Sequence, residues 1–332
     1  MKLNKIFSDG AVIPFGKPFK IYGESDGETI VSFHGTKRAA YPEKGVFSAE
    51  FPPMPCGGPF TIEVSCGEEK AVSRNVYIGK VYLIAGQSNV MFKTKECLDD
   101  WSDAADDKLL RSFFADHILF YDGDIDRFRA SDGWIPCRRD CIPDWTALSF
   151  FIGRELRKKS DAAVGMINCY EGASVIQSWL PETAFENGRF DLKREQMHPD
   201  HFDYDIWNAR SMLYRKTFGQ IKPYAVNGVI WYQGESNTTV KESEIYADEL
   251  KFLADSWRKD LGDENMPFIL VQIADFDGRK DDGWRGIQKA QKKAAEIIRG
   301  AKLVVSKDVC SSAGIHPPEK KELAKRIAQI LE

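Results

Sequence analysis

Several features are scarce in this sequence of 332 residues. No apolar run approaches the roughly 18 residues that a membrane-spanning helix needs, so we expect no membrane partner. Lys and Arg number 46 against 50 Asp and Glu, the net charge is −4, and the cations form no stripe, which argues against nucleic acid as a partner. The first ten residues lack an apolar h-region, so the sequence predicts a cytoplasmic location, or a secreted one if a leader has been removed.

Cysteine is also sparse and irregularly placed. The seven cysteines are odd in number and scattered along the chain, which favours free, mostly buried thiols in a reducing compartment. Cys137 and Cys141 have neither a second cysteine pair nor a histidine cluster nearby, so the spacing is not that of a zinc site. We therefore expect no metal and no cofactor.

What is present predicts a large core divided between two unequal domains. Hydrophobic residues make up 43% of the chain, enough for a sizeable core. Residues 1–76 are expected to form a small β-sandwich-like domain from short apolar runs separated by glycines: Phe19–Tyr22, Thr29–His34, Val46–Phe51 and Phe60–Val64. Residues 77–332 alternate apolar strands with helices, which predicts an α/β domain.

Ser88 is the first candidate for chemistry. Val81–Ala85 has the composition of a buried strand, Gly86 allows the backbone to turn, and Ser88 follows immediately. Ligands bind beyond the carboxyl ends of strands in open α/β sheets, so this serine is a candidate nucleophile. Serine is also a common turn residue, and Val90 replaces the second glycine of a Gly-x-Ser-x-Gly nucleophile elbow, so this motif alone does not decide between the two roles.

Three further segments place polar groups where other strands end. Gly172 and Ala173 follow the expected strand Ala163–Ile167, at a junction where a backbone N–H can face a developing negative charge. Gly228–Tyr232 is another apolar strand, and the polar side chains of Gln233, Glu235 and Asn237 crowd its end. His316 lies in a proline-flanked loop before the terminal helix. A serine, a histidine and oxyanion donors at one edge of a sheet are the groups that acyl transfer needs.

These segments resemble the successive blocks of a known family. Gly86-Gln-Ser-Asn89, Gly172-Ala-Ser174, Trp231-Tyr-Gln-Gly-Glu-Ser-Asn237 and Ile315-His-Pro317 are similar to those of the sialate O-acetylesterase group of SGNH hydrolases. The resemblance implies a flavodoxin-like three-layer α/β/α domain that removes O-acetyl groups from a small acetylated saccharide through an acetyl-serine, without a metal.

The resemblance also implies roles for individual residues. Ser88 matches the nucleophile and His316 the general base, while the N–H groups of Ser88 and Gly172, with the side chain of Gln233 or Asn237, match the oxyanion hole. The remaining matches imply a role in substrate binding for three residues: Gln87, Asn89 and Trp231.

The sequence departs from the family pattern at the acid member. An aspartate usually stands two or three residues before the histidine, but those positions are Gly314 and Ala313 here. Three replacements are open: Glu235, which we favour slightly, Asp308, or a backbone carbonyl in a Ser–His dyad. Ala173 also replaces a usual glycine, and its methyl group should narrow the site.

Two alternative functions follow from the same residues. The first is the same chemistry on xylan- or pectin-derived oligosaccharides, a choice that we expect to be made by aromatic residues of loops 93–144 and 181–210: Trp101, Trp134, Trp145, Trp207 and Tyr204. The second is a catalytically idle carbohydrate-binding protein, which the missing aspartate would permit.

Overall fold

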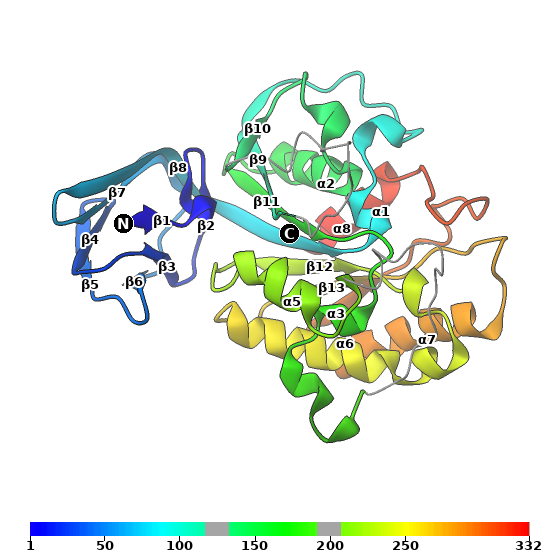
Figure 1. The fold of residues 1–332 in the computed structure, drawn as a ribbon. Coiled ribbons are helices and arrows are strands. Elements are labelled where there is room, and N and C mark those ends of the chain that lie inside the picture. The colour runs from blue at the N-terminus through cyan, green and yellow to red at the C-terminus, as the bar shows by residue number, and fades with distance from the viewer. Residues whose placement is uncertain (117–132, 191–206, 332) are drawn as a thin grey trace, which may run out of the picture.

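The computed structural model describes residues 1–116, 133–190 and 207–331, and Figure 1 shows their arrangement. The N-terminal part contains two β-sheets. The first is antiparallel and is formed by β1 (Lys2–Leu3), β3 (Phe19–Glu24) and β6 (Val46–Phe51). The second contains β5 (Thr36–Ala40), β4 (Thr29–Phe33), β7 (Gly57–Cys66), β2 (Val12–Pro14) and the first part of β8 (Glu69–Gly86).

Phenylalanine side chains hold these two sheets together. The ring of Phe19 on β3 lies 5.8 Å from that of Phe33 on β4 and 5.5 Å from that of Phe51 on β6. All three side chains are buried because alternate residues of each strand face the space between the sheets. The sandwich expected from the short apolar runs is therefore present.

Strand β8 connects the N-terminal part to a third, larger sheet. Its residues 69–78 pair with β7, whereas residues 80–86 pair with β11 and residues 82–86 with β12. The expected boundary between residues 76 and 77 thus falls inside one continuous strand. The long strand is visible in Figure 1 as the cyan ribbon that leaves the N-terminal part and enters the larger one.

The larger sheet has the strand order β10-β9-β11-β8-β12-β13-β14. Its remaining strands are β9 (Asp107–Phe114), β10 (Ile135–Cys137), β11 (Val164–Tyr170), β12 (Gly228–Tyr232), β13 (Phe268–Val271) and β14 (Ala301–Val304). All pairings are parallel except that of β10 with β9. The parallel strands are nearly continuous apolar runs, as expected for a sheet covered on both faces.

Helices cover the two faces of this sheet (Figure 1). The α-helices are α1 (Ser88–Met91), α2 (Ala147–Lys158), α3 (Ile176–Trp179), α5 (Met212–Lys216), α6 (Val240–Asp260), α7 (Asp282–Ile297) and α8 (Lys321–Leu331). Trp231 is in register with Ala85 of β8, and Tyr82 lies three residues earlier, so these two aromatic side chains point to opposite faces. The Tyr82 hydroxyl donates to the Leu331 carbonyl at the end of α8, whereas the Trp231 ring packs on Trp257 of α6.

Helices α2 and α8 pack on each other, as do α6 and α7. The arrangement is therefore the three-layer α/β/α fold that was expected. The long helices begin where capping predicts: the Thr239 side chain accepts from the Glu242 N–H at the start of α6, and Asp281 accepts from Trp284 at the start of α7. No helix among the described residues is long and apolar enough to cross a membrane.

The edge strand β10 and its neighbour β9 were not expected, because residues 93–144 have no regular hydrophobic period. Arg111 interrupts the apolar residues of β9, yet it is buried. Its guanidinium donates to the carbonyls of Gly10, Asn75 and Lys108, which satisfies the charge inside the protein. In a sequence, a buried arginine cannot be told from an exposed one. Arg111 therefore broke the apolar pattern by which the strand would have been predicted.

Candidate active site

The candidate site lies where three neighbouring parallel strands end. Gly86, the last residue of β8, is in register with Tyr170 of β11 and Tyr232 of β12. The chain that leaves β8 and the chains that leave its two neighbours therefore begin at the same level of the sheet. Open α/β sheets bind ligands beyond the carboxyl ends of such strands, at the point where the chain connections of two neighbouring strands run to opposite sides.

Gly86 allows these strand ends to approach one another. Its φ is +146°, and a Cβ atom added there would lie 2.0 Å from the carbonyl oxygen of Tyr232. No L side chain fits that space, because both the backbone conformation and the neighbouring backbone exclude it. The glycine thus sets the position of α1, whose first residue is Ser88.

The structure brings Ser88 and His316 together across 228 positions of sequence. Their Oγ and Nε2 atoms are 2.8 Å apart, a hydrogen-bond distance. Partial burial, and secondly the positive charge of Lys320, lower the pKa of His316 below its usual 6.5, while Glu96 has the opposite effect. The imidazole is therefore mostly neutral at pH 7 and able to accept a proton.

The structure places neither expected acid on His316. Both carboxylate oxygens of Asp308 pair with Arg326, each at 2.8 Å, and Glu235 instead accepts a 2.6 Å hydrogen bond from the Asn89 side chain. Among the described residues, none forms a hydrogen bond with the Nδ1 atom of His316. This geometry shows neither of the two carboxylates nor the backbone carbonyl that were considered from the sequence, and it leaves Ser88 and His316 as a pair among the described residues.

Two backbone N–H groups are available beside Ser88. The N–H groups of Ser88 and Gly172 have no acceptor among the described residues, the first because it opens helix α1. A side chain at Gly172 would find only the Met91 Cε atom within 4 Å, at 3.7 Å, so there is space in front of this residue. Ala173 has a φ of +51°, which explains why the family pattern has glycine there.

The side chains of Gln233 and Asn237 are not free to serve as oxyanion donors. The Gln233 amide nitrogen lies 2.9 Å from the Ser174 carbonyl and 3.0 Å from the Gln87 side-chain oxygen. The Asn237 amide donates to Gln177 at 3.0 Å and to Glu242 at 3.1 Å, and both side chains are fully buried. The expectation that either completes the oxyanion hole is corrected by these contacts, which hold the loops after β11 and β12 together.

The three residues expected to bind substrate are also buried. The Gln87 side-chain oxygen accepts from the Gly234 and Ser236 N–H groups, each at 3.3 Å, so this side chain fixes the loop after β12. Asn89 is 1% exposed and fully engaged by neighbouring groups. Trp231 is 1% exposed and packs edge-on against Trp179 and Trp257. None of the three offers surface to a ligand, and their places in the structure correct the substrate-binding assignment.

Most of the described aromatic residues in the expected specificity loops are also buried. Trp134, Trp145 and Trp207 are buried core residues, and only Trp101 of the described ones is partly exposed. Tyr204 lies outside the described residues. The described tryptophans therefore stabilise the loops more than they present faces to a sugar.

Lys320 is a residue that the sequence did not single out. It stands in the run Glu319-Lys320-Lys321-Glu322, which has the composition of a solvated helix start. In the structure its side chain is fully buried, and its Nζ atom donates to the Asn89 side-chain oxygen at 2.8 Å. No sequence signal distinguishes it from the exposed Lys321.

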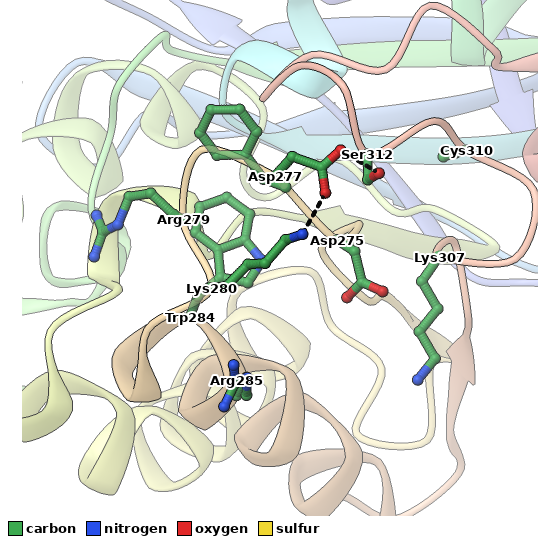
Figure 2. A pocket seen from close by; sticks show the side chains of 10 residues that line it. Asp275, Asp277, Arg279, Lys280, Trp284, Arg285, Lys307, Cys310 and Ser312 are labelled. Atoms are coloured by element: carbon green, nitrogen blue, oxygen red, sulfur yellow. Dashed lines mark hydrogen bonds and ion pairs between the residues drawn. The ribbon is translucent and has the colours of Figure 1, made fainter.

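A hollow of about 320 Å³ lies beside the loop that carries His316. It is lined by the loops that follow β13 and β14, and Figure 2 shows its charged residues, including the Asp277 carboxylate bonded to Ser312 and Lys280. Ser88 and His316 do not line it. The hollow is therefore a neighbour of the reactive pair and not its substrate pocket.

All seven cysteines are free, with Cys137, Cys141 and Cys169 buried and the other four partly or fully exposed. Burial raises the pKa of the Cys137 thiol to about 12, so this thiol stays protonated. Within residues 1–116, 133–190 and 207–331, no group of three or more His, Cys, Asp or Glu side chains could hold a metal ion.

Comparisons with known proteins agree with this geometry. The model of the family described as carbohydrate esterase, sialic acid-specific acetylesterase, matches residues 78–331, so the chain belongs to this family. Human sialate O-acetylesterase is 23% identical over 308 residues, which cover 83% of this chain and 58% of the human protein. Mouse sialate O-acetylesterase is 21% identical over 328 residues, covering 83% and 60%. The chain thus spans less than two thirds of the length of these relatives.

A solved structure extends the similarity to the whole fold. A carbohydrate acetylesterase from Xanthomonas citri superimposes with a TM-score of 0.84 and 25% identity, covering 99% of this chain and 74% of that one. The β-rich N-terminal part therefore has a counterpart in that enzyme's structure as well as the α/β part.

Proposed function

We propose that this chain is a serine carbohydrate O-acetylesterase that works with a Ser88–His316 dyad. The observation that carries the proposal is the 2.8 Å contact between Ser88 Oγ and His316 Nε2, made beside two unpaired backbone N–H groups. A serine hydroxyl needs a base to become nucleophilic, and the tetrahedral intermediate needs donors for its negative oxygen. Family membership and the names of the relatives support acetylated sugars as the substrate class.

The reaction then has two halves. In the first, Ser88 Oγ attacks the acetyl carbonyl carbon while His316 Nε2 takes the hydroxyl proton, and the N–H groups of Ser88 and Gly172 stabilise the oxyanion. The intermediate collapses, the C–O bond to the sugar breaks, and His316 returns the proton to the leaving sugar oxygen. In the second half, His316 takes a proton from water and the resulting hydroxide attacks the acetyl carbon of the acetyl-serine. The bond from that carbon to Ser88 Oγ then breaks, His316 returns the proton to Oγ, and acetic acid leaves and ionises to acetate.

The relatives' names make an O-acetylated sialic acid the first substrate to test. The xylan- or pectin-derived acetyl esters considered from the sequence are the second. The idle carbohydrate-binding alternative is disfavoured because the serine and histidine are in contact and the Ser88 and Gly172 N–H groups have no acceptor among the described residues. We propose no metal and no cofactor for this reaction, because a serine and a neutral imidazole suffice for it.

Acetate release from 4-nitrophenyl acetate and from acetylated sugars tests the proposal. Ser88→Ala and His316→Ala should each lower kcat by about a thousandfold or more. The matched controls are Ser160→Ala and His34→Ala, since neither residue contacts the dyad and His34 lies in the turn between β4 and β5. Equal turnover by wild type and Ser88→Ala would refute the esterase, and equal turnover by His316→Ala would refute the dyad.

A further inference from the structure

A fully buried lysine lies beneath the reactive serine, and the proposed reaction does not use it directly. The Lys320 Nζ atom makes one hydrogen bond to a described residue, at 2.8 Å from the Asn89 Oδ1 atom. It also lies 4.9 Å from the centre of the Phe92 ring and 5.7 Å from that of the Tyr232 ring, within the range of cation–π attraction. A buried ammonium without a directly bonded carboxylate is costly, so its position calls for a function.

The Asn89 side chain connects Lys320 to both members of the dyad by hydrogen bonds and by its place in the chain. Asn89 is the residue after Ser88, and its Nδ2 atom donates to the Ile315 carbonyl at 3.0 Å, one residue before His316. The same nitrogen donates to Glu235 at 2.6 Å. One amide side chain thus ties the serine turn, the histidine loop and the loop after β12 to one another.

Lys320 determines which way this amide faces. An ammonium can only donate hydrogen bonds, so it requires the oxygen of Asn89. This leaves the nitrogen for Glu235 and for the Ile315 carbonyl, which can only accept. With a neutral apolar side chain at position 320, the amide would lose the partner of its oxygen. The Ile315 carbonyl would then be held less firmly, and the position of His316 relative to Ser88 would vary.

The charge of Lys320 acts on His316 as well. Lysine and glutamate charges oppose each other here: Lys320 lowers the pKa of the imidazole and Glu96, from the segment before β9, raises it. Glu235, on the loop after β12, interacts electrostatically with Lys320. Burial and, secondly, the Lys320 charge together outweigh Glu96, so the imidazole stays neutral to lower pH than an ordinary histidine does.

We propose that Lys320 is a positioning residue of the dyad, which orients Asn89 so that Ser88 and His316 stay in reactive contact. The inference rests on the proposed esterase function. In this arrangement Lys320 and Asn89 hold the backbone next to His316 in place. An aspartate would instead orient the imidazole directly, through its Nδ1 atom. Because Lys320 bonds to Asn89 and to neither Ser88 nor His316, it is a support and not a participant.

The test compares Lys320→Met, which removes both charge and donor, with Lys320→Gln, which removes the charge but keeps an N–H donor. We expect Lys320→Met to lower kcat on 4-nitrophenyl acetate by about 10- to 100-fold with little change in KM, and Lys320→Gln to lose less. In both variants the acid limb of the kcat/KM profile should move to higher pH, because a positive charge has left the histidine. The surface variant Glu96→Gln should move the same limb to lower pH.

Arg258→Met is the matched control, because it removes another buried cation, on α6, whose guanidinium donates to the Met266 and Arg299 carbonyls. It should lower the melting temperature and leave both kcat and the acid limb unchanged. If Lys320→Met does not fold, Lys320→Gln carries the test.

Folded Lys320 variants with wild-type kcat and an unmoved acid limb would overturn the proposal, as would a fall in kcat with the limb unmoved. Both results require a wild type that turns over acetyl esters. A wild type inactive on every ester would instead overturn the esterase function, and the positioning role with it.

Discussion

Replacing Gly86 by alanine tests whether the close approach of β8 and β12 sets the reactive geometry. The added Cβ would lie 2.0 Å from the Tyr232 oxygen, while real Cβ atoms essentially never come within 3.0 Å of another heavy atom. The two backbones would therefore have to separate by about 1 Å, and alanine would also be forced into a φ of +146°. Strain of this kind costs about 1–3 kcal/mol before any loss of packing is counted.

The displacement should appear in catalysis as well as in stability. A shift of about 1 Å in a reacting group can lower a rate about 100-fold, equivalent to about 2.7 kcal/mol of barrier. We expect Gly86→Ala to lose about 3 kcal/mol of unfolding free energy in urea titrations. Its kcat/KM on 4-nitrophenyl acetate should fall about 100-fold under conditions where it remains folded.

Gly300→Ala provides the control, because Gly300 has a φ of +69° and nothing within 4 Å of an added Cβ, at the amino end of β14. It should lose about 1 kcal/mol through backbone strain alone and keep full activity. A Gly86→Ala protein with the stability and turnover of Gly300→Ala would refute the argument that this approach positions Ser88.

Four further outcomes are expected. Gln233→Leu should lower the free energy of unfolding by about 3 kcal/mol in urea, since it leaves several buried partners unpaired, and an unchanged midpoint would contradict the network. Trp231→Leu should cost about 3 kcal/mol through the cavity it leaves while KM stays constant, whereas a tenfold rise in KM would restore its substrate-binding role. Asp308→Asn should keep kcat within about twofold, because the carboxylate bonds elsewhere, and a thousandfold loss would identify it as the third catalytic member. Since His316 must be neutral to act and burial lowers its pKa below 6.5, the midpoint of the acid limb of kcat/KM should lie below pH 6.5, which a pH profile measures.

The reactive pair could be predicted from the sequence because its position follows from the strand pattern. An apolar run places the residues that follow it at the edge of a parallel sheet, and this held for Ser88 after Gly86 and for Gly172 after β11. His316 lies in the loop that follows β14. The family resemblance added the pairing of serine with histidine. Their catalytic roles remain proposals for the kinetic tests above.

The roles of the buried amides could not be predicted in the same way. Gln233 and Asn237 have the residue type of oxyanion donors. Whether an amide can donate to a ligand depends on whether its hydrogens are already bonded, and only the folded structure shows this. Lys320 is the converse case, because a sequence gives its charge but not its burial. Such errors arise where polar side chains are buried and paired with partners far along the chain.

The continuity of β8 has a consequence for how the protein can unfold and evolve. A strand of 18 residues supplies ladder hydrogen bonds to both sheets, so the N-terminal sandwich and the catalytic sheet have no flexible linker between them. Separation of the two parts would break the strand, so loss of order in one is transmitted directly to the other. Such a protein should unfold as one cooperative unit. Recombination could not exchange the sandwich for another domain without also replacing part of β8, the strand that precedes Ser88.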